Sequence, residues 1–186
     1  PQDPMTSLDP LYTIGDQLLE VIEIHQGKKG KEAKEIAIAA LERVKIPDAR
    51  EKLGAYPHEF SGGMKQRVII AMALACNAQI IIADEPTTAL DVTVQAQIME
   101  ILREIKAKSD ISIILITHDM GIVAQNADKI AVMYAGRIVE FASKDELFKN
   151  PKHPYTKALL KVILDINSDK IETIEGQPRS ITDKIE

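Results

Sequence analysis

Apolar residues recur along the first third of this chain every three or four positions, the spacing of helices that bury one face. The predicted helices cover residues 15–25, 31–45 and 48–53. Gly27 should end the first helix and Pro47 the second, and Asp48 could cap the third. Residues 1–10, with three prolines, predict a loop. These residues together predict a helical lobe without strands.

After residue 61 the pattern changes to short apolar runs separated by helices. A nearly continuous apolar stretch over residues 68–75 predicts a helix buried on most sides. The predicted strands cover residues 80–83, 111–116, 129–134 and 137–141, and an amphipathic helix covers 92–106. The first three strands are typical of strands buried on both faces. Strands that alternate with helices predict parallel crossover units, so the fold class is α/β, a parallel-sheet core plus a helical subdomain.

The end of the chain is expected to be less regular. The turn Ala135-Gly136 should make the last strand antiparallel to its predecessor. Helices are predicted near residues 145–149 and 155–166, and a polar connector follows from residue 167.

Composition excludes some classes of partner. The chain has 186 residues, and its 23 basic and 28 acidic side chains give a net charge of −5, so we expect no nucleic acid held by bulk charge. Its single cysteine, Cys76, rules out an internal disulfide framework. No apolar run approaches the ~20 residues of a membrane span, so we expect any membrane association to go through a partner.

Ser61-Gly62-Gly63 precedes the apolar helix and is the first candidate site. Ser61 can cap the helix, and glycines let a ligand approach the backbone. The free N–H groups and the positive end of the helix dipole then favour an anion. An ordinary loop before a buried helix is the competing interpretation.

Asp84 and Glu85 follow a buried strand, at the edge where open α/β sheets bind ligands. Because successive side chains of a strand point in opposite directions, one acid could face a metal ion and the other an attacking water. That pairing suits phosphoryl transfer. A polar strand end with Asp-Glu-Pro as a turn is the alternative.

Two further residues are ambiguous when taken alone. His118 follows another predicted strand; it is either a loop histidine or a group that hydrogen-bonds a terminal phosphate or a water. Asp91 is expected to cap the helix that starts at Val92, whatever else it does.

Taken together, these segments resemble the nucleotide-binding subunits of ABC importers, in particular the dipeptide/oligopeptide and nickel permease ATPases. The matching stretches are residues 2–8, 56–67, 84–97, 116–119, 132–137 and 153–156. The family signature motif has Gln where this chain has Met64, which is normal for the peptide-permease branch. No Gly-x-x-x-x-Gly-Lys-Ser/Thr phosphate loop (Walker A) occurs in the 186 residues.

The resemblance implies a role for each matched residue in an ATP and Mg²⁺ site. Gln2 corresponds to the Q-loop glutamine near the metal and the attacking water. Ser61, Gly62 and Gly63 correspond to the signature motif, which binds the γ-phosphate of ATP held by the opposite subunit. The remaining correspondences are Asp84 with the Walker B aspartate that binds the metal, Glu85 with the catalytic glutamate, Asp91 with the D-loop aspartate and His118 with the switch histidine.

The resemblance also implies an organisation. The Q-loop would cover residues 1–10, a helical subdomain with the signature motif 11–75, the α/β catalytic core 76–142, and a helical tail with its connector 143–186. We expect the chain to be the part of such a subunit from the Q-loop onward. As a consequence, we expect the 186 residues alone to be inactive and to bind Mg-ATP no tighter than about millimolar, because the phosphates lack their backbone donors and Lys.

The intact subunit is expected to hydrolyse ATP at the cytoplasmic face of the membrane and to energise uptake of peptides or related solutes. Its partners would be two transmembrane permease subunits, a second ATPase subunit arranged head to tail and, indirectly, an extracytoplasmic solute-binding protein. Two alternatives stay open: an ABC ATPase that is not part of a transporter, and a non-enzymatic module that lends only its signature motif.

Overall fold

The structure is a computed structural model that describes residues 7–88 and 90–164. The chain divides into two compact units, Pro1–His118 and Asp119–Glu186, and each is described by itself. The four segments expected from the sequence, with boundaries after residues 10, 75 and 142, were defined by motifs and not by packing. They remain predictions. No described helix is long and apolar enough to cross a bilayer.

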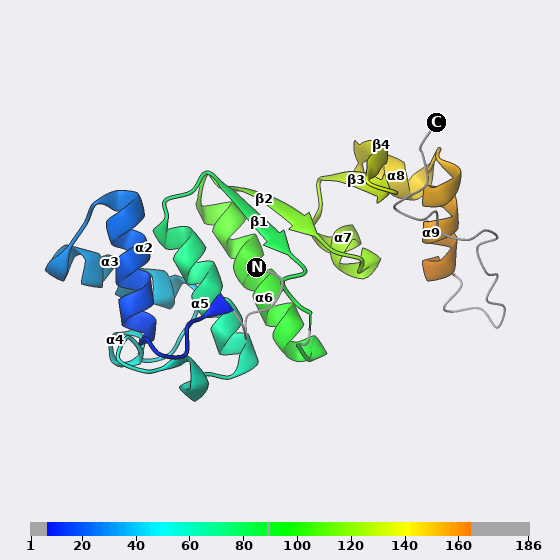
Figure 1. The fold of residues 1–186 in the computed structure, drawn as a ribbon. Helices are drawn as coiled ribbons and strands as arrows, with labels where there is room; N and C mark the ends of the chain where they lie inside the picture. Colours follow the sequence, from blue (N-terminus) through cyan, green and yellow to red (C-terminus); the bar gives the residue numbers. More distant parts are fainter. Residues whose placement is uncertain (1–6, 89, 165–186) are drawn as a thin grey trace. The chain divides into compact units, whose positions relative to one another are not determined.

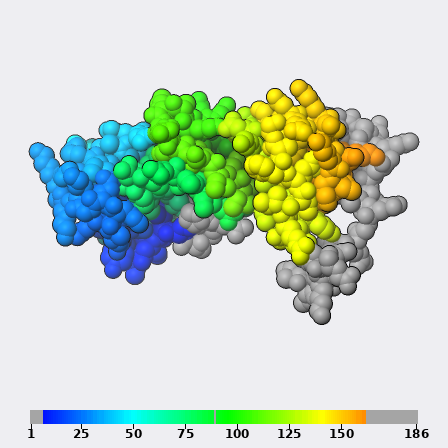
Figure 2. All heavy atoms as spheres, turned by 90° about the horizontal axis from the view of Figure 1, so that it is seen from above, coloured from blue at the N-terminus to red at the C-terminus, as the bar shows by residue number. Residues whose placement is uncertain are grey.

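The first unit begins with a group of helices, as the apolar periodicity predicts. They are α2 (Ile14–Gln26), α3 (Gly30–Arg43), α4 (Ala49–Lys52), the 3₁₀ turn η1 (Pro57–Glu59) and α5 (Gly62–Ala75). Leu18, Ile22, Leu41 and Val44 have no exposed surface and form the core of this helical group. Its blue and cyan atoms gather in one region of the surface in Figure 2. The described residues of the group contain no strand, as predicted.

The ends of these helices follow local rules. Thr13 and Asp16 form a reciprocal capping box at the start of α2, and Gly27 ends the helix in the left-handed region at φ 68°. The third helix is shorter than expected: Asp48 precedes α4 at φ 50°, and its side chain makes no capping hydrogen bond. Its proposed capping role is therefore wrong, because N-cap residues normally have extended backbone.

The α3 helix ends at Arg43, two residues earlier than predicted. Lys45 N–H donates to Glu42 O at 2.9 Å and Ile46 N–H donates to Leu41 O at 3.0 Å. These two bonds form a Schellman motif, in which the residue after the cap is left-handed and is usually glycine. Here that residue is Lys45, at φ 60°.

A parallel crossover follows the helical group. It consists of β1 (Ile80–Asp84), α6 (Val92–Lys108) and β2 (Ser112–Ile116), and the strands pair in parallel with Asp84 opposite Ile116. The predicted crossover is confirmed, and α5 and α6 lie beside the strand pair in Figure 1. The strands consequently end at one edge, which brings Glu85 and the residues after Ile116 together.

The prediction that these strands are buried on both faces is wrong for the described part of the chain. Ile81 and Ala83 are buried, but Ile80 and Ile82 are 57% and 62% exposed. On β2, Ile114 and Ile116 are 50% and 48% exposed. A parallel strand is buried on both sides only where other elements cover both faces of its sheet. The described residues cover one face of this pair, which leaves four isoleucines at the other.

The second unit contains α7 (Met120–Asn126), β3 (Lys129–Tyr134), β4 (Arg137–Ser143), α8 (Lys144–Lys149) and α9 (Pro154–Leu164). The strands β3 and β4 form an antiparallel hairpin, as predicted, through Ala135 and Gly136 at φ 48° and 76°. Two positive φ values are typical of the tight turns that match strand twist. The core of this unit is made by Met120, Ile130, Val132, Leu147 and Leu160.

One expectation for this unit is corrected. Residues 129–134 were expected to be a strand buried on both faces of the parallel layer, but β3 alternates between buried and exposed positions and forms a separate two-stranded sheet with β4. Antiparallel hairpins commonly keep one face in solvent, which accounts for the alternation.

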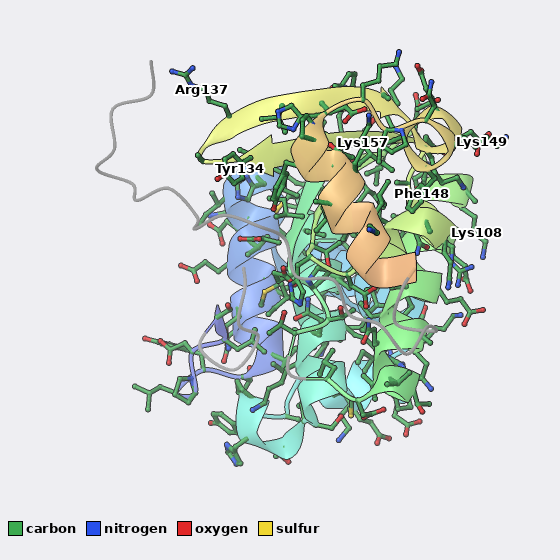
Figure 3. The ribbon with its side chains drawn as sticks, turned by 90° about the vertical axis from the view of Figure 1, so that its right-hand side faces the viewer. Lys108, Tyr134, Arg137, Phe148, Lys149 and Lys157 are labelled. Carbon is green, nitrogen blue, oxygen red and sulfur yellow. The ribbon has the colours of Figure 1, made fainter. Side chains whose placement is uncertain are left out.

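The last helix is held in place at its start. Glu140 accepts hydrogen bonds from the N–H groups of Lys152 and His153 at 2.8 and 3.0 Å. The rings of Tyr134 and Tyr155 lie 4.7 Å apart. Figure 3 faces this unit, with Tyr134 at the end of β3 and Phe148 on α8. The predicted helix from residue 155 begins one residue earlier, with Pro154 at a first-turn position where proline is favoured.

Candidate functional site

The polar end of β1 forms the first part of the site. Asp84 is the last residue of the strand, and Glu85 leaves it with a left-handed φ of 45°. Glu85 N–H donates to Ile116 O at 2.9 Å, which fastens this turn to the end of β2. Alternation along a strand therefore does not set the direction of the Glu85 side chain, because Glu85 lies outside the strand. A non-glycine residue in this region is strained, and such residues cluster at functional sites.

Hydrogen bonds hold the Glu85 carboxylate instead. Its Oε1 lies 2.7 Å from His118 Nδ1 and accepts from His118 N–H at 3.2 Å. Its Oε2 accepts from the Thr88 hydroxyl at 3.2 Å. The Glu85 side chain is 17% exposed, whereas that of His118 is 85% exposed. One carboxylate is thus clamped from two sides at the sheet edge, beside a histidine that solvent reaches.

The protonation state follows from these contacts. Burial alone would raise the pKa of Glu85, but the hydrogen bonds from His118 and Thr88 outweigh burial and lower the pKa below its ordinary value. Glu85 is therefore ionised at neutral pH. Because an ionised carboxylate only accepts, the proton between the two groups belongs to Nδ1 of His118.

Asp84 offers a carboxylate next to this pair and is partly exposed. Within the described residues, no cluster of three or more His, Cys, Asp or Glu side chains could hold a metal by itself. Mg²⁺ in phosphoryl-transfer sites needs only one or two carboxylates, since phosphates and waters complete its shell. A single partly exposed aspartate fits that donor set.

The second part of the site is the start of α5. Ser61 caps the helix by accepting from Met64 N–H at 3.3 Å. Asp91 caps α6 in the same way and accepts from Val94 N–H at 3.0 Å, which confirms its expected structural role. The two helix starts touch: a Cβ added to Gly63 would lie 2.4 Å from Val94 Cγ1. Any larger residue at this position would force the Val94 side chain or α6 itself to shift.

The structure thus sorts the candidate residues into two groups. It brings Glu85 and His118 together next to Asp84, and it places Ser61, Gly62 and Gly63 at a helix start beside the helix that Asp91 caps. None of these contacts joins the two groups. Gln2 lies outside the described residues.

Two residues that make contacts in the site were not predicted from the sequence. The Thr88 hydroxyl donates a hydrogen bond to the Glu85 carboxylate, and its position only three residues after Glu85 could have indicated this contact. Arg67, at the end of the matched stretch 56–67, bonds to Lys45 and Gln97. Its position one helical turn after Gly63 indicated only that the two residues share a face of their helix.

An α/β crossover with an Asp-Glu pair at its edge, followed by a histidine, is the arrangement of an ATP-binding cassette. Family models agree: residues 1–88 match "ABC transporter", and residues 139–186 match "Oligopeptide/dipeptide transporter, C-terminal region". Two solved structures of the cassette MJ0796 are similar, both with a TM-score of 0.63 over 74% of this chain and 59% of theirs. One, at 28% identity, is a dimer in a post-hydrolysis state bound to ADP and Pi.

Curated relatives specify the branch. The chain is 54% identical over 179 residues to the dipeptide transport ATP-binding protein DppD of Bacillus subtilis, covering 95% of this chain and 53% of that protein. It is 51% identical to the oligopeptide transport ATP-binding protein OppD of Haemophilus influenzae, over 97% and 56% of the two chains. The chain belongs to the ABC transporter ATP-binding proteins, and it spans about half the length of these relatives.

Proposed function

We propose that this chain supplies the signature motif and the hydrolytic carboxylate of an ABC ATPase that energises peptide uptake. The clamped Glu85 carries the proposal, because its contacts with His118 and Thr88 hold an ionised carboxylate at the edge of a parallel sheet. The printed names of two similar proteins, a dipeptide and an oligopeptide transport ATP-binding protein, support the choice of peptides as cargo.

The chemistry assigned to Glu85 is to orient and deprotonate the attacking water. A carboxylate can accept about four hydrogen bonds, and the contacts described use two on Oε1 and one on Oε2. Oε2 can therefore accept one more hydrogen bond, which a water could donate. His118 keeps the carboxylate in place, and its exposed ring can also contact a terminal phosphate.

ATP and Mg²⁺ complete the proposed site. Asp84 would hold the metal, with Gln2 as a further ligand expected from the sequence. Bound Mg²⁺ would neutralise charge that develops on the phosphate oxygens. The capped start of α5, with Ser61, Gly62 and Gly63, would receive the γ-phosphate of ATP held by a second subunit, because helix starts bind anions.

Substitution of Glu85 by Gln in the intact subunit tests the catalytic role. The amide keeps the size of the side chain but cannot take a proton, so ATP should still bind while turnover falls by about 10²–10⁴-fold. ATP-bound dimers should accumulate in gel filtration. The matched control is Glu51→Gln, the same chemical change on the exposed side of α4. Turnover of Glu85→Gln equal to that of the control would remove Glu85 from this role.

The proposal includes two kinds of partner. A second ATPase subunit, identical or homologous, would bind head to tail so that each signature motif faces the other subunit's nucleotide. The dimeric MJ0796 cassette supports the pairing of two ATPase subunits by its similarity. Two permease subunits would anchor the pair at the cytoplasmic face of the membrane and receive peptide from a solute-binding protein.

The helix α2 is the proposed permease contact. Its exposed side combines carboxylates with apolar residues around a shallow depression lined by Asp16, Leu19, Glu20, Glu23 and Ile24. Ile24 is 68% exposed, and Leu11 just before the helix is 80% exposed. A permease loop with basic and apolar residues would match this surface.

Cysteine crosslinking from Glu20 in the assembled transporter tests this placement. A crosslink to a cytoplasmic permease loop is expected. If Glu20→Cys gives none, while cysteines in α8 and α9 crosslink efficiently, the permease binds elsewhere.

A further inference from the structure

The starts of α5 and α6 are joined at two successive turns. At the first, Gly63 lies against Val94 with no room for a Cβ. One turn further along both helices, Arg67 Nη2 donates to Gln97 Oε1 at 2.7 Å. Residues four apart on α5 and three apart on α6 lie on one face of each helix, so both contacts belong to one seam.

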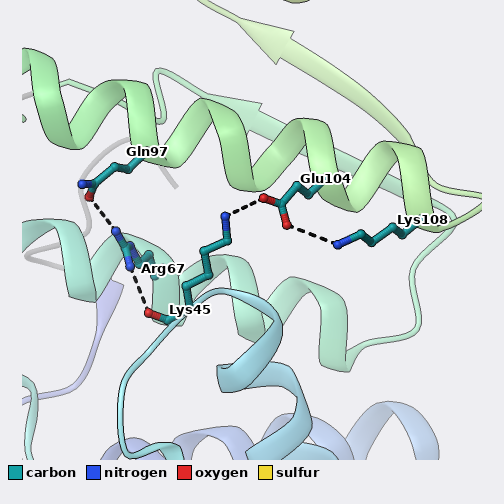
Figure 4. A network of polar contacts seen from close by, with 5 residues as sticks. All are labelled: Lys45, Arg67, Gln97, Glu104 and Lys108. Atoms are coloured by element: carbon teal, nitrogen blue, oxygen red, sulfur yellow. Dashed lines mark hydrogen bonds and ion pairs between the residues drawn. The ribbon is translucent and has the colours of Figure 1, made fainter.

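Arg67 also reaches a third element. Its Nη1 donates at 3.0 Å to the carbonyl oxygen of Lys45, the left-handed residue that ends the Schellman motif after α3. Figure 4 shows the Arg67 side chain between this carbonyl and Gln97 on α6. The planar guanidinium can serve both acceptors at once because its donors form a rigid fork. A lysine has a single nitrogen on a flexible stem and cannot reproduce that geometry.

The side chain of Lys45 adds a second link between the same elements. Its Nζ lies 2.5 Å from Glu104 Oε1, and Lys108 Nζ approaches Glu104 Oε2 at 3.4 Å. The Lys45 and Glu104 side chains are 46% and 35% exposed, and ion pairs this exposed contribute little. Arg67 is itself half-buried and bonds to two elements at once through a planar group, so its bonds are the ones expected to matter.

We propose that Arg67 is a positioning residue that makes the capped starts of α5 and α6 move as one body with the α3–α4 turn. Ser61-Gly62-Gly63 on α5 and Asp91 at the start of α6 would then present one preset surface to the opposite subunit. This inference rests on the proposed function for its kinetic consequence. Its structural part concerns only how α5, α6 and the α3–α4 turn are held together, and it does not depend on ATP hydrolysis.

Hydrogen exchange in the intact subunit tests the structural part. The amides of Met64 and Lys65 are protected by Ser61, and those of Val94 and Gln95 by Asp91. Because Arg67→Lys breaks the fork and keeps the charge, all four amides should exchange about tenfold faster, the scale of one lost charged hydrogen bond. The control is Arg103→Lys, on the exposed side of α6.

Steady-state ATP hydrolysis by the assembled transporter tests the kinetic part. A misplaced signature motif should lower kcat of Arg67→Lys by about 10–100-fold and leave KM within about threefold, since nucleotide would be held mainly by the opposite subunit. Gln97→Ala removes one exposed acceptor and should lower kcat by about threefold to tenfold. Lys45→Gly keeps the carbonyl, suits the left-handed backbone and removes only the ion pair, so its kcat should stay within about twofold of wild type.

Several results would overturn the inference. One is exchange in Arg67→Lys that matches the Arg103→Lys control. Another is faster exchange with an unchanged kcat, and a third is a Lys45→Gly defect as large as that of Arg67→Lys. Failure of the proposed function would look different, because Glu85→Gln would then turn over normally whatever Arg67 does.

Discussion

The helical group and the β1–β2 pair in the same unit bury their apolar residues to very different extents. Leu18, Ile22 and Leu41 have no exposed surface, although the helices that carry them are short and amphipathic. The strands are more apolar along their length, yet Ile82 is 62% exposed and Ile114 is 50% exposed. Hydrophobicity of a segment therefore does not tell how much of it the described chain buries.

This difference in burial comes from the number of apolar faces that each kind of element has to cover. An amphipathic helix has one apolar stripe, and two or three neighbours in sequence suffice to cover it. A parallel strand has two apolar faces, and each needs its own layer. The helices of the first unit cover one another's apolar faces, whereas the described elements cover only one face of the strand pair. The polar site lies at the end of that half-covered pair.

The largest expected effect is on stability. Leu41→Ala removes a fully buried side chain and should lower the free energy of unfolding of the 186-residue chain by about 2–5 kcal/mol. Ile82→Thr keeps a β-branched residue on the exposed face and should change it by about 0.5 kcal/mol or less. Urea unfolding followed by circular dichroism measures both. Equal losses would mean that the strand face is as well packed as the helical core.

A smaller effect is expected on self-association. Ile82→Lys puts a charge in the middle of the exposed strand face, so the chain should self-associate about tenfold more weakly in sedimentation or light scattering. Ile24→Lys is the control, because Ile24 is 68% exposed on a helix of the closed group. If both variants reduce self-association equally, the exposed strand face is not the surface through which the chain self-associates.

The smallest effect concerns pH and the polar edge of the sheet. The pKa of Glu85 is lowered in the folded chain, so its contribution to stability is present above the unfolded pKa of about 4.3 and is lost as pH falls through the folded pKa. Wild type should therefore exceed Glu85→Gln in stability at pH 6, and the gap should shrink at pH 3.5. Leu41→Ala, by contrast, should cost the same at both values. A gap that widens on acidification would contradict the assigned direction.

The local sequence pattern was sufficient to predict most of the helices and strands. The predicted helix over residues 15–25 and the hairpin at Ala135-Gly136 formed as expected, because helix ends and tight turns depend on residues close in sequence. The parallel pairing of β1 with β2 also followed from order alone, since a helix separates the strands. The candidate site residues were identified by motif, and their chemical roles remain predictions.

Other features depended on residues far apart in the chain. Three features need the packed elements in place: which strand faces are covered, that β3 pairs with β4 alone among the described strands, and the contact of Gly63 with Val94. The Glu85–His118 hydrogen bond joins residues 33 positions apart, and that of Arg67 with Gln97 spans 30. The sequence by itself determined the family, the order of elements and the residue types of the site. Only the tertiary structure decided which of those residues share a hydrogen bond, because that depends on how the strand ends and helix starts are brought together in space.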